Sequence, residues 1–178
     1  MASLDISSLF FTRDLLNIYY EQLDIDHNAR KKIIKFADPL DYAYQSPNQI
    51  TTIKTEDDSF DQCVLTYKSA QNYYQSEKVR ILRGPEEAEK VRLSDEPFQD
   101  GFVPIEEYNM KRDKWRAYKY DVAFKCNWLK FTQNKELARA LLDTGRSRIV
   151  SRRRAEWSRT NSKFLMIIRE DLRRRGVD

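Results

Sequence analysis

Residues 66–80 read Thr-Tyr-Lys-Ser-Ala-Gln-Asn-Tyr-Tyr-Gln-Ser-Glu-Lys-Val-Arg, and they mark a change from strand to helix. The alternating segment that ends at Tyr67 suits a half-buried strand, and Ser69 is a suitable N-cap for a helix that follows at once. The plainer interpretation of that helix is a surface element with Tyr73 and Val79 packed inward. However, spacings of three and four place amides, a phenol and an ammonium group on one face: Gln71, Tyr74, Gln75 and Lys78. A polar face of this kind suits the wall of a pocket.

The same helix resembles a known family. Residues 69–79 look like the signature helix of the NADAR superfamily, the YbiA-like N-glycosidases, whose pattern reads S-x-E-H-Y-x-Q-x-x-K-F. The family's tyrosine, glutamine and lysine are kept as Tyr73, Gln75 and Lys78. Gln71 stands where the family has glutamate, and Asn72 stands where it has histidine. The resemblance therefore keeps the frame of the helix and changes two of its polar groups.

The resemblance extends over about residues 33–173. Trp115 matches a tryptophan of the family. Residues 130–145 then follow the family's pattern K-F-x-Q-N-x-x-L-x-x-x-L-L-x-T-G at nearly every fixed position. After the glycine the family continues with a strand, a catalytic loop and a last helix ending L-M-x-x-R-x-x-L. Here Ser151 replaces the glutamate of that strand, Arg154 replaces an aspartate of the loop, and Ser158 replaces its first glycine. The order of elements is kept, whereas the family's acids are not.

The predicted fold class is α+β, a single helix-dominated domain with a small β-sheet, as the NADAR resemblance implies. Helical periodicity over residues 114–142 and 164–173 supports it. The sheet is expected from residues 50–54, 63–67 and 147–150, with the first two forming a hairpin, and a further short strand is expected at residues 33–36. Residues 31–178 would form the NADAR-like domain. Residues 1–30 would be an N-terminal helical extension that docks on the domain or on a partner.

Local signals place several boundaries. A helix is expected after Ser7 or Ser8, and another begins at Pro85, which suits the first turn of a helix. Asn134 is expected to cap the helix over residues 135–142. Residues 94–104 contain two prolines and a glycine and are the best candidate for a mobile loop.

The family's reaction, as the resemblance implies it, is hydrolysis of an N-glycosidic bond in a ribosylated nucleotide or an ADP-ribosyl group. Its oxocarbenium-like transition state requires carboxylates. Gln71 can hydrogen-bond a ribose hydroxyl but cannot act as a base, so Lys78 is the main catalytic candidate, as an amine nucleophile. The alternative for Lys78 is a simple phosphate or carboxylate contact. Glu77 or Glu156 would be the stand-in acid.

The remaining candidates would bind substrate, and each has a structural alternative. Trp115 and Trp157 would stack on a base or ribose, or form part of the core. Lys130 would reach a phosphate, or cover a helix end. The full set of predicted substrate-binding residues is Tyr74, Trp115, Lys130, Asn134, Arg154 and Trp157.

Charge is concentrated near the C-terminus. The chain has 178 residues, 34% of them charged, and a net charge of +4. Residues 146–178 carry 11 Lys and Arg against 4 Asp and Glu, a balance of +7, so the preceding residues are net acidic. Arg152, Arg153 and Arg154 could bind a phosphate, or could simply be solvated surface. A second hypothesis follows: an inactive binding protein that contacts nucleic acid or another anionic partner through this basic segment.

The cysteines, the apolar runs and the N-terminal residues of the sequence indicate which other classes of protein are not expected. Cys63 and Cys126 lie in apolar patterning, and with one histidine they form no metal-ligand set, so we expect reduced core thiols, no metal and no cofactor. No apolar run approaches the length of about 20 residues that spans a bilayer. The N-terminus does not resemble a signal peptide. We therefore expect no membrane partner and an intracellular location, cytoplasmic or nuclear.

Overall fold

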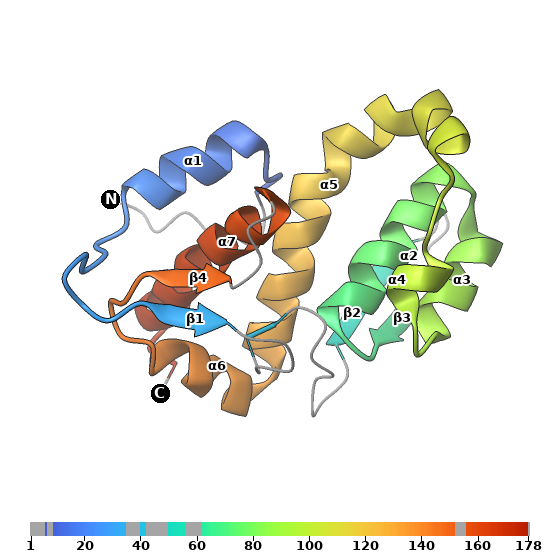
Figure 1. The fold of residues 1–178 in the computed structure, drawn as a ribbon. Helices are drawn as coiled ribbons and strands as arrows, with labels where there is room; N and C mark the ends of the chain where they lie inside the picture. The colour runs from blue at the N-terminus through green and yellow to red at the C-terminus, as the bar shows by residue number, and fades with distance from the viewer. Residues whose placement is uncertain are drawn as a thin grey trace.

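The fold is α+β with helices predominating, as predicted (Figure 1). The computed structural model describes residues 6, 9–34, 40–41, 50–55, 62–151 and 156–177. Its elements in chain order are α1 (Arg13–Glu21), β1 (Lys32–Ile34), β2 (Ile50–Thr55), β3 (Gln62–Tyr67), α2 (Ala70–Leu82), α3 (Pro85–Leu93), α4 (Pro97–Asp100), α5 (Ile105–Gln133), α6 (Lys135–Leu142), β4 (Ile149–Ser151) and α7 (Glu156–Arg174).

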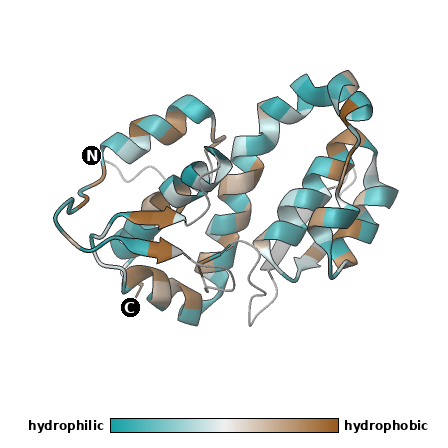
Figure 2. Ribbon diagram, viewed as in Figure 1, coloured by the Kyte–Doolittle hydropathy of each residue, from teal (hydrophilic) through white to brown (hydrophobic). Residues whose placement is uncertain are grey.

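Helix α5 runs through the middle of the molecule. Its 29 residues make it about 44 Å long. Figure 1 shows α1, α6, α7, β1 and β4 on one side of α5, and α2, α3 and α4 on the other. The first half of α5 is largely hydrophilic in Figure 2, whereas β1 and β4 are strongly hydrophobic. The second half of α5 supplies buried residues to both sides, Ala123 and Phe124 to one and Val122 and Cys126 to the other.

Each side of α5 has its own hydrophobic cluster. On the α7 side, Phe11 stacks on Phe124 with ring centroids 3.7 Å apart, and Phe164 meets both rings edge-on. On the α2 side, Tyr73 and Trp115 belong to the second cluster. The described part of the N-terminal segment thus lies on the domain itself, because Phe11 is fully buried.

The strands form two separate pairs, which corrects the prediction of one sheet. β2 and β3 form the predicted antiparallel hairpin, with Ile50 opposite Tyr67. β4 does not join them. It pairs in parallel with β1, with Lys32 opposite Ile149. The parallel pairing joins residues that lie more than a hundred positions apart, so no local signal predicts it.

Several helix boundaries also differ from those expected. α1 begins at Arg13, and its N-cap is Thr12, whose side chain accepts from the Leu15 amide, so a start at Ser7 or Ser8 is wrong. α5 begins at Ile105, earlier than the predicted residue 114. The N-cap Ser69 and the start of α3 at Pro85 are confirmed.

Two further expectations concern cysteine and membranes. Cys126 is a buried free thiol, and burial raises its pKa to about 12, so it is the expected core thiol. The side chain of Cys63 lies outside the described residues. Within the described ranges, no helix combines the length and apolar character that crossing a membrane requires.

Candidate functional site

One stripe of α2 stays partly open to solvent. Gln71, Tyr74, Lys78 and Ile81 are half-buried, and Arg80 is exposed, whereas every other residue of α2 is buried. Because these four residues recur at spacings of three and four, they lie one above another on a single face. The plainer interpretation, a surface helix with two inward residues, is therefore wrong. We refer to Gln71, Tyr74, Lys78 and Ile81 as the α2 stripe.

The α2 stripe meets two tryptophans from other helices. The Tyr74 ring lies 5.2 Å from Trp115 of α5 in an edge-on contact, and 5.4 Å from Trp157 of α7. Trp115 is buried, while Trp157 is half-buried. Three predicted substrate-binding residues from three helices are therefore brought together. Aromatic faces at such a meeting point suit the stacking of a base or a ribose.

Lys78 lies one turn beyond Tyr74 on the same face. Burial lowers the pKa of its ammonium group to about 8, and the charge of Arg83 adds to the effect. A lysine with this pKa is partly unprotonated near neutral pH, and an unprotonated amine is the nucleophilic form. Gln71 lies one turn before Tyr74, so the two predicted catalytic residues flank the tyrosine on the α2 stripe.

Glu77, one of the two predicted stand-in acids, is poorly placed to act as the catalytic acid. It is buried, and its Oε2 accepts from Arg80 Nη2 at 2.7 Å and from Nε at 3.0 Å. Its charge also raises the pKa of Tyr73, although burial of that phenol is the larger cause. Both guanidinium nitrogens bond the same carboxylate oxygen, so the side chain is engaged in a contact within α2. Glu77 therefore acts first as a folding contact.

Two other carboxylates next to site residues have partners as well. Glu156, the second stand-in acid, is exposed and lies 3.3 Å from Arg13. Asp121 is buried, and it accepts from the Phe11 amide at 3.0 Å and lies 2.8 Å from Lys125 Nζ. Asp121 thus fixes the N-terminal segment on α5.

Lys130 and Asn134 are buried at the end of α5. Lys130 is fully buried, and its Nζ donates to the carbonyl of Asp41 at 2.5 Å. Asn134 occupies the N-cap position of α6, as predicted, but its side chain donates back to the Lys130 carbonyl at 2.9 Å and does not cap the helix. The Lys130 bond ties residue 41 to α5, and the Asn134 bond holds the α5–α6 junction. That Gln71, Lys78, Trp115 and Lys130 line one cavity stays a prediction.

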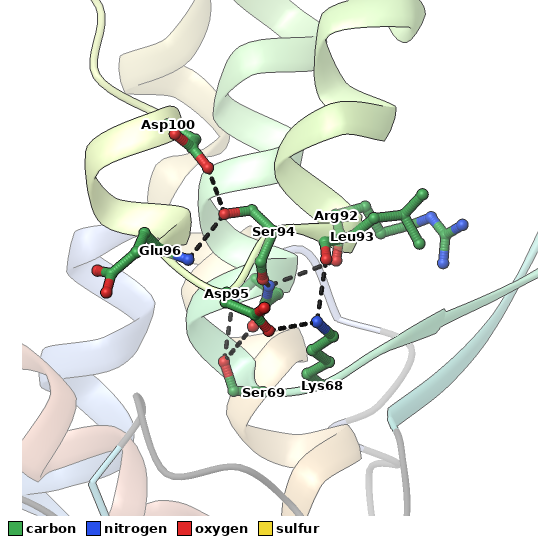
Figure 3. A network of polar contacts seen from close by, with 9 residues as sticks. Lys68, Ser69, Arg92, Leu93, Ser94, Asp95, Glu96 and Asp100 are labelled. Carbon is green, nitrogen blue, oxygen red and sulfur yellow. Dashed lines mark hydrogen bonds and ion pairs between the residues drawn. The ribbon is translucent and has the colours of Figure 1, made fainter.

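Asn72, which stands at the family's histidine position, fixes the α3–α4 connection, whose residues Ser94, Glu96 and Asp100 are seen in Figure 3. Its Nδ2 donates to the carbonyls of Ser94 at 2.8 Å and Arg92 at 3.3 Å. Ser94 Oγ in turn donates to Asp100 and accepts from the Glu96 amide. Asn72 therefore anchors a neighbouring segment.

The segment after α3 is packed against α2 and contains α4, so the expectation of a mobile loop over residues 94–104 is wrong. Gly101 is buried, and a Cβ added there would lie 2.7 Å from the Pro97 carbonyl and 2.9 Å from Gln75 Cβ. A close approach of this kind leaves no room for a side chain. The glycine therefore serves tight packing against Gln75, whereas its local sequence favours a loop.

In the described part of the basic C-terminal segment, the arginines at the end of α7 are ion-paired. Arg152, Arg153 and Arg154 lie outside the described residues, so their roles stay predictions. On α7, Arg173 and Arg174 pair with Glu170, and Arg175 pairs with Asp171. These ion pairs reduce the charge that the end of α7 offers to an anionic partner.

Tyr120 and Lys119 extend the aromatic group, although no sequence pattern indicates them. Tyr120 lies 5.7 Å from Trp157, and the ammonium group of Lys119 lies 5.1 Å from the Tyr120 ring and 5.9 Å from Trp157. Tyr120 is five positions from Trp115, a spacing that does not share a helix face, so periodicity gives no signal for it. The contact arises where α7 crosses α5.

Fold and site together define a class: a helix-dominated α+β domain with an aromatic-lined polar stripe on its second helix. The sequence profile of the NADAR domain matches residues 35–158, which is more than half of the chain. The protein therefore belongs to the NADAR domain family.

A solved structure shows a similar fold. The NMR structure of the Escherichia coli protein YbiA aligns with a TM-score of 0.56 and 20% sequence identity, over 87% of this chain and 93% of that chain. No curated protein sequence matches the chain. Identity at this level supports the fold and leaves the chemistry to the residues themselves.

Proposed function

We propose that this NADAR-family protein binds an N-ribosylated nucleotide or an ADP-ribosyl group along the α2 stripe, with hydrolysis of the N-glycosidic bond very slow or absent. The observation that carries the proposal is the contact of Tyr74 with both Trp115 and Trp157. A base or ribose would lie against this group. Lys78, one turn away, would contact a phosphate or the sugar.

The expectation of slow hydrolysis follows from the acids. Gln71 and Ser151 stand at two of the family's carboxylate positions, and Arg154 stands at a third. Loss of a general acid or base costs about 10²- to 10⁴-fold in rate. Glu77 is held by Arg80, so it is a poor substitute. The amine of Lys78 is the group best suited to any remaining chemistry, because burial lowers its pKa to about 8.

The test separates binding from turnover. ADP-ribose is titrated into the wild-type protein by isothermal calorimetry, and release of base from an N-ribosylated pyrimidine phosphate is followed by chromatography. We expect measurable binding of ADP-ribose and no base release above the uncatalysed rate. Tyr74→Leu and Lys78→Met should each weaken binding about tenfold or more.

The matched control is Lys114→Met, which removes an exposed lysine from α5. It should bind ADP-ribose like the wild type. No binding by the wild type, or equal losses in Lys78→Met and Lys114→Met, would overturn the proposed site. Rapid base release that Lys78→Met abolishes would instead show an active glycosidase.

A further inference from the structure

A strongly basic pocket lies on the other side of α5 from the α2 stripe. It has a volume of about 640 Å³ and lies between the start of β1 and the α6–β4 turn. Its lining residues, which we call the basic pocket, are Arg30, Lys31, Lys32, Ile33, Asp143, Thr144 and Ser147. The lining thus includes three cations and one carboxylate. Arg30 and Lys31 are exposed, and neither forms an ion pair within the described part of the chain.

A fourth cation lies directly behind the wall of the basic pocket. Arg169 of α7 is buried, with 2% of its surface exposed. Its Nη1 donates to Thr144 Oγ1 at 2.7 Å and to the Ser147 carbonyl at 2.8 Å, and both residues line the pocket. Thr144 Oγ1 also donates to the Leu141 carbonyl, so its hydroxyl hydrogen is already used. The guanidinium therefore holds two residues of the pocket wall from inside.

Arg169 is short of negative charge. Among the described residues no carboxylate forms an ion pair with it, and its Nε is buried without a hydrogen-bond partner. Burial lowers its pKa to about 10, which still leaves the group charged at neutral pH. Buried charges in folded proteins are normally paired. An anion in the basic pocket would supply the missing counter-charge across the Thr144 and Ser147 wall.

We propose that the basic pocket binds the phosphate group of a small phosphorylated ligand. Arg30, Lys31 and Lys32 would contact the phosphate oxygens, with Ser147 Oγ as a neutral donor, and Arg169 would position the wall. Phosphate oxygens accept several charge-assisted hydrogen bonds at once, which fits cations gathered in one hollow. A nucleic-acid backbone would instead need cations spread along a row of phosphates. The arginines at the end of α7 are poorly suited to this, because they are ion-paired.

The basic pocket is independent of the α2 stripe. In Figure 1, β1 and the α6–β4 turn lie on the opposite side of α5 from α2. None of the residues that line the pocket belongs to the aromatic group around Tyr74. A ligand in one site would therefore leave the contacts of the other unchanged, and the two proposals can fail separately.

The experiment uses inorganic pyrophosphate as the probe. Its affinity for the full chain is measured by calorimetry at constant ionic strength. Lys31→Gln/Lys32→Gln removes two cations of the pocket and should weaken binding about tenfold. Lys135→Gln/Arg139→Gln removes two exposed cations from α6 and is the matched control, with affinity expected to stay within about twofold. Asp143→Asn removes the pocket's carboxylate and should tighten binding.

Three outcomes would overturn the proposal. The first is no detectable binding of millimolar pyrophosphate by the wild type. The second is an equal loss in both double variants, which would show diffuse attraction by net charge. The third is tighter binding of a short single-stranded RNA than of pyrophosphate, lost in Lys31→Gln/Lys32→Gln, which would make the surface a nucleic-acid contact.

Discussion

The two sides of α5 are held together by different kinds of contact. On one side, α7 buries a continuous apolar run over residues 164–168. On the other side, α2 buries Asn72, Gln75, Ser76 and Glu77 together with Tyr73 and Val79. Apolar contacts are non-directional, whereas hydrogen bonds fix orientation. Thus α7 supplies stability, while Asn72 and Ser76 set the rotation of α2, because they donate to carbonyls of α3 and of the segment after it. This rotation brings Tyr74 of the α2 stripe against Trp115 and Trp157.

The largest effect is expected on the apolar side. Phe164 is fully buried and touches the rings of Phe11 and Phe124. Phe164→Ala removes these contacts and leaves a cavity, so the free energy of unfolding should fall by about 3–5 kcal/mol. Urea denaturation followed by circular dichroism measures it. A loss below about 1 kcal/mol would mean that the α7 side is not the main source of stability.

A smaller, localised effect is expected on the polar side. Asn72→Ala leaves the carbonyl of Ser94 without its donor, which should cost about 1–3 kcal/mol. Because the contact is local, hydrogen exchange should speed up mainly in residues 94–101. Asn109→Ala, at an exposed position of α5, is the matched control and should change neither quantity. Uniformly faster exchange across the chain would contradict a local anchor.

How far these contacts follow from the sequence differs between the two sides. Three of the four residues predicted for one polar face, Gln71, Tyr74 and Lys78, do lie on the α2 stripe, because their spacing places them on one face of a helix. The prediction is wrong for the fourth, Gln75, which is buried. The burial of the other faces of α2 is not predictable from this spacing, because the elements that cover them are α3, α4 and α5. Gly101 is an example of what the local sequence does not predict. Its neighbours favour a loop, whereas the structure packs this glycine against Gln75.

The basic pocket is harder to predict. It combines the start of β1 with the α6–β4 turn, which depends on the parallel pairing of Lys32 with Ile149. Arg169 matches an arginine of the family's last helix, but nothing in its local sequence points to Thr144, which lies 25 positions away. Tertiary contacts of this kind carry no periodic signal.

The smallest stability effect is expected at Lys78, and it depends on pH. The folded pKa is about 8 against an ordinary value of 10.5. Between these values the unfolded chain holds a proton that the folded protein has released, so the contribution of Lys78 to stability rises with pH across this window. Below pH 8 the cost of the buried charge is fully present.

Lys78→Met should therefore be more stable than the wild type at pH 7, by about 1–2 kcal/mol after allowance for solvent screening. The difference should shrink toward pH 10.5. Urea denaturation at several pH values measures it, with Lys114→Met as the control that shows no such trend. A variant less stable than the wild type at pH 7 would show that Lys78 contributes to the packing of α2 and is not held there for a ligand.

The central claim, that the α2 stripe and its tryptophans bind the ligand, is tested most directly by fluorine NMR of the protein labelled with 5-fluorotryptophan. The chain has three tryptophans. Trp115 and Trp157 contact Tyr74, whereas Trp128 donates to Asp171 and lies under Arg175, away from the stripe. Titration with ADP-ribose should shift the Trp157 resonance most and Trp115 less, and leave Trp128 unchanged. A shift of Trp128 alone, or binding that moves none of the three, would contradict the account.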